Sequence, residues 1–172
     1  MRGRAGSFVA LFGASILLQV LLFDNIEMWG VVAPYPYIIF VLLLPRGTSR
    51  LLAVLLGFAL GLLVDVSSST LGLQAAATTL IAYLQPLALR VLGGREKEGV
   101  AIPSLRRMGF IWTLEFTLLL TLIHHAFLFI LSEPSWGHLG LLTFRIVGST
   151  LLTTFIILLA ETFVFATPAD SN

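Results

Sequence analysis

The chain has 172 residues, of which 58% are hydrophobic and only 11% are charged, and its formal net charge is +1. A water-soluble domain usually carries about 25% charged residues, so this composition excludes an ordinary soluble domain. The absence of cysteine excludes disulfides, thiolate metal sites and a cysteine nucleophile. No run of basic residues is long enough to predict nucleic-acid binding. The composition therefore predicts a single integral membrane domain over residues 1–172.

Apolar runs separated by short polar segments predict an all-α polytopic membrane bundle with six transmembrane helices. The runs are too long, and alternate too little, to be strands of a membrane barrel. The first run follows a basic start at Arg2 and Arg4, and we interpret it as an uncleaved span rather than a signal peptide. The predicted spans are residues 8–23, 30–45, 51–66, 71–92, 108–131 and 139–166.

Lys and Arg residues predict the orientation of these spans. With the N-terminus in the cytoplasm, the inside segments hold nine of the ten basic residues, all except Arg145. The outside turns hold none and contain acidic residues instead, among them Asp24, Glu27 and Glu133. This distribution follows the positive-inside rule, so both termini are expected to be cytoplasmic.

Aromatic and amide side chains have expected places in such a bundle. Trp and Tyr residues fall near the predicted membrane interfaces, where they are typical of an aromatic anchoring belt. Glutamines within spans are expected to form hydrogen bonds between helices. The belt residues are Trp29, Tyr35, Tyr37, Trp112 and Trp136, and the glutamines are Gln19, Gln74 and Gln85.

A stripe of small residues marks the third predicted span. Gly57 and Gly61 lie one helical turn apart, and Asp65 lies a further turn along the same face. Glycines at this spacing let another helix approach closely. The stripe is therefore the best candidate for a helix–helix seam, either within this chain or with a partner, and base rates favour the internal seam.

The polar segment between the fourth and fifth spans is the largest in the chain, and we expect a loop or a surface helix there. Its basic residues are either a patch that attracts anionic lipid head groups or a cytoplasmic contact for another protein. They are Arg90, Arg95, Lys97, Arg106 and Arg107.

Glu115 in the fifth span and Glu161 in the sixth are predicted at a similar depth toward the cytoplasm. Two carboxylates at one height can share a proton or a cation, but separate protonation or bonding to hydroxyls is the favoured interpretation. His124 and His125 are adjacent, so on a helix they point about 100° apart and do not predict a metal pair.

Arg145 lies about 9 Å inside the sixth predicted span, at ~1.5 Å per residue. A long side chain at that depth can extend back to the membrane interface. Alternatively it forms an ion pair in the bundle or with a partner helix, and Asp65, His124 or His125 are then the nearest candidates. The sequence supports these two interpretations equally.

Motifs that carry catalysis are missing from the sequence. It has no G-x-S-x-G, no H-E-x-x-H, no phosphate-binding loop and no carboxylate cluster with metal spacing. We therefore expect a protein that is not an enzyme and that has no cofactor and no metal.

Residues 56–75 carry a family resemblance. A glycine-rich span ends in Asp65, a polar turn with Leu71-Gly72-Leu73 follows, and a small-residue helix runs to Ala82-Tyr83-Leu84. A proline-led span from Pro34 to Pro45 precedes them. These features resemble the rod shape-determining protein MreD family. The specific match covers spans two to four, while chain length and the six-span outline match throughout.

This resemblance implies a non-enzymatic scaffold of the cell-elongation machinery in the bacterial cytoplasmic membrane. It implies a bitopic MreC-like partner and, through it, an MreB-like filament, a RodA-like glycosyltransferase and a penicillin-binding transpeptidase. The family fold has been likened to the substrate-binding subunits of vitamin-uptake (energy-coupling factor) transporters, which are the alternative function. Such a subunit should present an outward cavity lined by polar and aromatic groups.

Overall fold

Five long helices dominate the computed structural model, which describes residues 2–26, 31–93, 101–133 and 138–163. Each is long and apolar enough to cross a membrane, so the chain is a multi-pass membrane protein. They coincide with the first, third, fourth, fifth and sixth predicted spans. The helices are α1 (Arg2–Leu21), α3 (Arg50–Ser68), α4 (Leu73–Gly93), α6 (Phe110–Ser132) and α7 (Leu139–Phe163).

The second predicted span, residues 30–45, is not a spanning helix. Its described part runs without regular helix to Tyr35 and then forms the 3₁₀ turn η2 (Pro36–Ile38) and the four-residue α2 (Ile39–Leu42). Pro34 and Pro36 have no N–H to donate, and a residue before proline is held away from helical angles. Tyr35 accordingly has φ −124° and ψ 58°. The six-helix prediction is therefore wrong at this segment.

Burial in protein explains why this broken segment is so apolar. Every residue from 36 to 44 is buried, and those from Tyr37 onward belong to the main hydrophobic core. Irregular backbone at membrane depth is tolerated when protein surrounds it. Hydrogen bonds tie the segment to the helices: Ala33 N donates to Ser149 Oγ at 3.1 Å, and Gln85 Nε2 donates to the Leu44 carbonyl at 3.0 Å.

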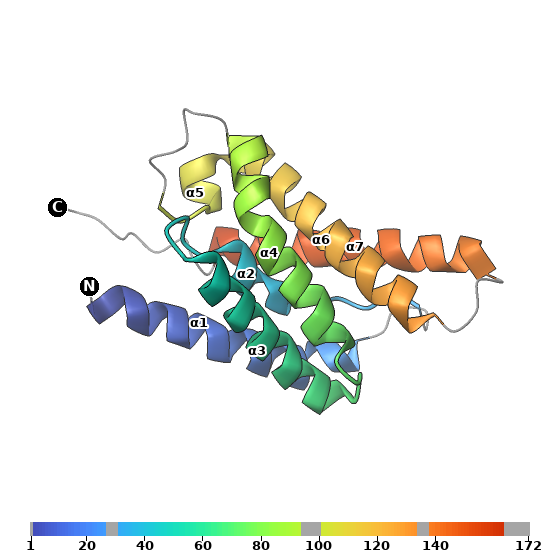
Figure 1. Ribbon diagram of the computed structural model, residues 1–172. Helices are drawn as coiled ribbons and strands as arrows, with labels where there is room; N and C mark the ends of the chain where they lie inside the picture. The colour runs from blue at the N-terminus through green and yellow to red at the C-terminus, as the bar shows by residue number, and fades with distance from the viewer. Residues whose placement is uncertain (1, 27–30, 94–100, 134–137, 164–172) are drawn as a thin grey trace.

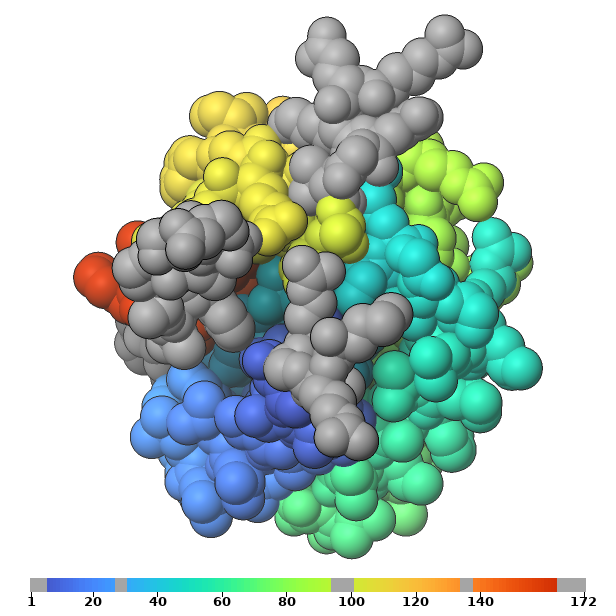
Figure 2. All heavy atoms as spheres, turned by 90° about the vertical axis from the view of Figure 1, so that its left-hand side faces the viewer, coloured from blue at the N-terminus to red at the C-terminus, as the bar shows by residue number. Residues whose placement is uncertain are grey.

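The start of α1 and the end of α7 lie at the same end of the bundle (Figure 1). The α2–α3 loop and α5 (Leu105–Met108) lie there too. Arg46 N of the loop donates to the Ala101 carbonyl, and Leu105 N of α5 donates to Glu161 Oε2 of α7. Figure 2 looks onto this face and shows α5 in yellow, the end of α4 in green and the start of α3 in cyan. We call it the basic end, after Arg46, Arg50, Arg90, Arg106 and Arg107.

The opposite end contains η1 (Phe23–Asn25) and the turn between α3 and α4, and we call it the turn end. Ser69 closes α3 there in the left-handed conformation, with φ 57°. Ser68 Oγ donates a 2.6 Å hydrogen bond to Asp24 Oδ2, which joins the turn to the end of α1. Asp24 and Asp65 thus lie near the turn end, whereas five arginines gather at the basic end.

Candidate functional site

Gly57 and Gly61 face α4 at very close range. A Cβ added at Gly61 would lie 2.5 Å from the Gln74 carbonyl oxygen and 2.6 Å from Ala75 Cα, and one at Gly57 would lie 2.7 Å from Ala82 Cβ. The seam that the sequence left open is thus internal to the chain, between α3 and α4. It is closed to any partner helix.

Asp65 completes this seam by capping α4. Its Oδ1 accepts from Gln74 N at 3.0 Å and from the Thr70 hydroxyl, and its Oδ2 accepts from Ala75 N at 2.7 Å. The first N–H groups of a helix have no partner within the helix, and its N-terminus favours a negative charge. Asp65 satisfies both needs while only 4% exposed. Its carboxylate positions the turn and is not available to Arg145.

Tyr37 is the centre of a buried polar cluster and does not belong to an aromatic belt. Its hydroxyl lies 2.8 Å from Gln74 Oε1, 2.7 Å from Thr78 Oγ1 and 3.0 Å from His124 Nε2. All four residues are at most 1% exposed. Trp112 is also buried, and its ring stacks on Phe116 with centroids 4.8 Å apart. Trp29 and Trp136 lie outside the described residues.

The two histidines face different neighbours, as adjacent helical positions must. His124 points to Tyr37, whereas His125 Nδ1 lies 2.8 Å from the Thr121 carbonyl and its Nε2 lies 3.4 Å from Thr153 Oγ1. Thr153 Oγ1 also accepts the Tyr35 N–H at 3.0 Å. The histidines therefore fasten α6 to the broken segment and to α7, which is a structural role in the packed core.

Glu115 and Glu161 have different surroundings despite their similar predicted depth. Glu115 is exposed on the outer face of α6, while Glu161 is 3% exposed on α7. Glu161 Oε2 accepts the Leu105 N–H at 2.6 Å and so holds α5 against the end of α7. One carboxylate faces outward and the other stabilises an interior contact.

The basic residues of the polar segment are placed in part. Arg90, Arg106 and Arg107 are exposed at the basic end, while Arg95 and Lys97 lie outside the described residues. Two further arginines at this end pack against α4. Arg46 Nη2 donates to the Leu89 carbonyl at 3.4 Å, and the Arg50 guanidinium lies 5.0 Å from the centre of the Tyr83 ring.

A polar cavity of about 430 Å³ opens at the turn end. Segments far apart in the sequence line it: the end of α1, the α3–α4 turn, the residues before η2 and the first turns of α7. Such a volume lies in the range of small-molecule sites. The side chains that give it polarity are Asp24, Ser67, Ser68, Thr70, Gln74 and Arg145.

Arg145 faces this cavity without a carboxylate partner among the described residues. Its guanidinium lies 4.5 Å from the centre of the Phe129 ring, a cation–π contact, and its Nε is buried with no hydrogen bond. Neither Asp65 nor a histidine meets it, because Asp65 caps α4 and the histidines bond elsewhere. The ion pair with Asp65 or a histidine is therefore not formed, whereas extension toward the membrane interface stays a prediction.

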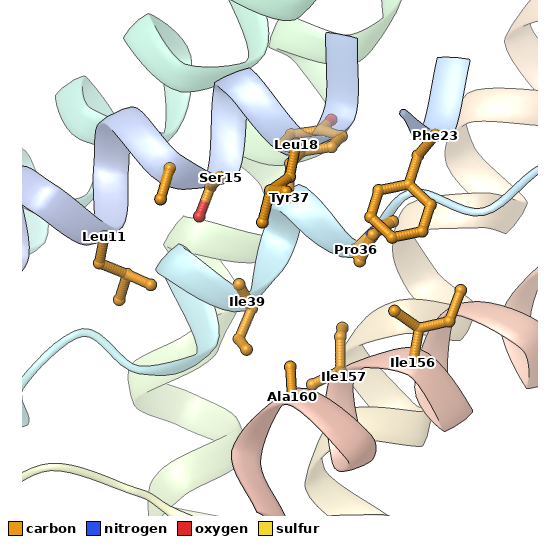
Figure 3. Close-up of a pocket in the computed structure, with 11 residues that line it drawn as sticks. Leu11, Ser15, Leu18, Phe23, Pro36, Tyr37, Ile39, Ile156, Ile157 and Ala160 are labelled. Carbon is orange, nitrogen blue, oxygen red and sulfur yellow. The ribbon is translucent and has the colours of Figure 1, made fainter. Parts of the chain in front are cut away.

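An apolar groove runs along the side of the bundle between α1 and α7, and its volume is about 170 Å³. Figure 3 shows side chains of the two helices on opposite walls, with the broken segment between them as the floor. The groove is lined by Leu11, Ser15 and Leu18 of α1, Ile157 and Ala160 of α7 and Pro36 of η2. Ser15 Oγ is buried there without a hydrogen-bond partner.

Sequence reasoning placed Asp24 in an outside turn and Tyr37 in an aromatic belt. It did not predict that Asp24 lines a cavity or that Tyr37 is buried. The available signals were the break in hydropathy at residue 24 and the two prolines around Tyr35, both of which indicated a connection rather than a site. The three glutamines, expected to bond between helices, bond to the broken segment instead: Gln19 Nε2 donates to the Pro34 carbonyl and to Asp24 Oδ1, Gln74 accepts from Tyr37, and Gln85 donates to the Leu44 carbonyl.

Comparisons with protein-family models, with curated proteins and with solved structures give no match. Among the hollows that the described residues form, the polar cavity and the lateral groove are the two candidate sites. The cavity has a polar lining of the kind that small polar molecules need, and the groove has an apolar lining.

Proposed function

We propose that this protein is a non-enzymatic membrane scaffold of the bacterial cell-elongation machinery, located in the cytoplasmic membrane, and that it binds a bitopic MreC-like partner. The resemblance of residues 56–75 to MreD supplies the family. The groove between α1 and α7 is the observation that carries the proposal, because it offers a single transmembrane helix a lateral place to bind.

The floor of the groove is the broken segment, whose residues from 36 to 44 are themselves buried. It is made by Pro36, Tyr37 and Ile39, which belong to η2 and α2 rather than to a continuous helix. Lipid tails cannot bond to the backbone groups of irregular chain, so such chain is normally enclosed by protein. Just 11% of the apolar window of α1 is buried, so most of this helix is open to lipid or to a further helix.

Small residues on the walls let a helix approach. Ala14 and Ser15 lie on α1 and Ala160 lies on α7. In membranes, small side chains at an interface allow close backbone contact, and a serine can bond across it. A helix with its side chains is about 10 Å across, and the hollow is too narrow to hold one. A partner helix would therefore lie over the hollow and insert side chains into it.

The basic end supports a cytoplasmic orientation and a second contact surface. Arg90, Arg106 and Arg107 are exposed there, at the end that also holds the start of α1 and the end of α7. Positive charge marks the cytoplasmic side of membrane proteins. We infer that this face meets anionic lipid or the cytoplasmic parts of the machinery, and that the MreB-like filament, the RodA-like glycosyltransferase and the penicillin-binding transpeptidase are reached through the bitopic partner.

Copurification of the co-expressed MreC-like protein tests the scaffold. Ala14→Trp fills the groove, whereas Ala10→Trp places the same side chain on an exposed position of α1 that does not line it. We expect Ala14→Trp to reduce recovered partner roughly tenfold, since an overpacked contact costs about 1–3 kcal/mol. Ala10→Trp should recover it normally. Equal recovery with both variants would contradict docking in the groove.

The polar cavity supports the alternative function, a substrate-binding subunit of a vitamin-uptake transporter. Tyr35 and the polar side chains around Arg145 give the turn end the outward polar site that such a subunit needs. A vitamin bound at one per chain, together with an ATP-binding partner protein, would favour this function over the scaffold.

A further inference from the structure

The polar cavity at the turn end holds two opposite charges that do not meet. Arg145 and Asp24 both line it, yet no ion pair joins them within the described part of the chain. Opposite charges around one hollow normally pair when they can reach each other. Here the cavity, about 430 Å³ in volume, lies between them.

We propose that this cavity binds a zwitterion, with its anionic group on Arg145 and its ammonium group on Asp24. The inference does not depend on the scaffold proposal. A carboxylate or phosphate would supply an acceptor for the Arg145 guanidinium, which lines the cavity and which no carboxylate pairs with among the described residues. A bidentate contact to the guanidinium fork would add a second hydrogen bond while the Phe129 ring holds the group in place.

Asp24 is prepared to receive the positive group. Its Oδ1 accepts from Gln19 Nε2 at 2.8 Å and its Oδ2 accepts from Ser68 Oγ at 2.6 Å, which fixes the carboxylate in orientation. An ionised carboxylate has about four acceptor positions, so two remain for a ligand. Asp24 is exposed, and those positions face accessible space.

The charge balance of the cavity selects the ligand class. A simple anion would bring a second negative charge toward Asp24, and a simple cation would leave Arg145 unpaired. The hydroxyls of Ser67 and Thr70 and the amide of Gln74 add hydrogen bonds between the two charges. Phe23 and Ile26 provide an apolar wall for the carbon skeleton.

Two sources offer this chemistry. One is the headgroup of an aminophospholipid, in which a phosphate and an ammonium group are joined by two carbons. The other is a free solute of amino-acid type, in which a carboxylate replaces the phosphate. The cavity lies at the turn end, beside the ends of the spans, so in a bilayer it would be within reach of the membrane surface and of solution.

Full-length protein in nanodiscs distinguishes the sources. In the lipid arm, discs contain equal phosphatidylethanolamine and phosphatidylglycerol, and native mass spectrometry counts the lipids retained. In the solute arm, discs contain phosphatidylglycerol alone, and thermal unfolding is followed with L-alanine or alanyl-alanine, against acetate and ethylammonium as single-charge controls. Selective retention of phosphatidylethanolamine identifies the headgroup. A stabilisation by the zwitterions alone identifies the solute.

Matched variants make the assignment specific. Arg145→Gln and Asp24→Asn should each weaken retention or stabilisation roughly tenfold, the effect of one charge-assisted hydrogen bond. Arg145→Lys keeps the charge and should retain part of the binding, which guards against a folding defect. Arg50→Gln removes an arginine at the basic end and should bind as the parent does. The proposal is overturned if phosphatidylethanolamine is not selectively retained and the zwitterions give no specific stabilisation. Equal binding by Arg145→Gln and Arg50→Gln would overturn it as well.

Discussion

Replacing Gly61 with alanine is expected to force α3 away from α4. The added Cβ would lie 2.6 Å from Ala75 Cα, whereas ordinary contacts begin at 3.4 Å, so the backbone must retreat by 0.8 Å or more. No flexible side chain can absorb this displacement, because the neighbouring atoms belong to the backbone of α4. The retreat also draws the N–H groups of Gln74 and Ala75 away from Asp65.

The loss in free energy of unfolding follows from these two effects, the close contact and the weakened cap. Overpacking a tight contact costs about 1–3 kcal/mol. The bonds from Asp65 to Gln74 N and Ala75 N, now 3.0 and 2.7 Å, would stretch toward or beyond the range of good hydrogen bonds, which adds about 1–3 kcal/mol. Alanine returns about 0.5–1 kcal/mol in helix propensity. We therefore expect Gly61→Ala to lower the free energy of unfolding by about 2–4 kcal/mol.

Reversible unfolding in mixed micelles, followed by circular dichroism, measures this change. Gly13→Ala is the matched control, since Gly13 is also inside a spanning helix and an added Cβ there meets nothing within 4 Å. The control should be neutral or slightly stabilising. If Gly61→Ala unfolds with the same free energy as Gly13→Ala, the close α3–α4 seam is refuted.

Further variants test the other buried contacts. Asp65→Ala should cost about 2–4 kcal/mol in the same assay and Asp65→Asn about half of that, because asparagine keeps one acceptor for the N-terminus of α4; equal losses would contradict the cap. Tyr37→Phe should cost about 1–3 kcal/mol, since it removes the hydroxyl that Gln74 and His124 share; an unchanged stability would contradict the buried cluster. Glu161→Ala should speed hydrogen exchange at the Leu105 amide roughly tenfold, while Glu161→Gln keeps an acceptor and should change it little; equal rates in both would contradict the α5 contact.

Hydropathy predicted the five spanning helices well because lipid-facing helices need about 20 apolar residues and little else. The third span, predicted as 51–66, is α3 from Arg50 to Ser68. The same signal failed at residues 30–45, since an apolar run records burial without saying whether lipid or protein does the burying. Pro34 and Pro36 were the available warning, and they were interpreted as a helix start.

Helical periodicity predicted faces better than it predicted partners. The spacing of Gly57, Gly61 and Asp65 places them on one face, and all three do face α4. Depth alone paired Glu115 with Glu161, but depth does not fix the rotation of a helix, and Glu115 turned out to be exposed. The rotation of α6 about its axis is set by its packing against α4 and α7. These contacts cannot be deduced from the sequence of α6 alone.

The polar cavity was beyond sequence reasoning for a geometric reason. It draws Asp24 from the end of α1, Gln74 from the start of α4 and Arg145 from α7. These residues line one hollow because hydrogen bonds join α1 to the α3–α4 turn and the broken segment to α7. The sequence placed Arg145 inside a span, and the fold shows which hollow it faces.

Site-specific photocrosslinking tests docking in the groove most directly. A photoreactive residue at position 18 would lie in the groove, and one at position 63 would lie on the outer face of α3; Leu18 and Leu63 are similarly exposed, at 54% and 45%. With the MreC-like protein co-expressed, we predict a crosslink to its transmembrane segment from position 18 and none from position 63. Crosslinks to this partner from position 63 alone, or equally from both positions, would contradict the account.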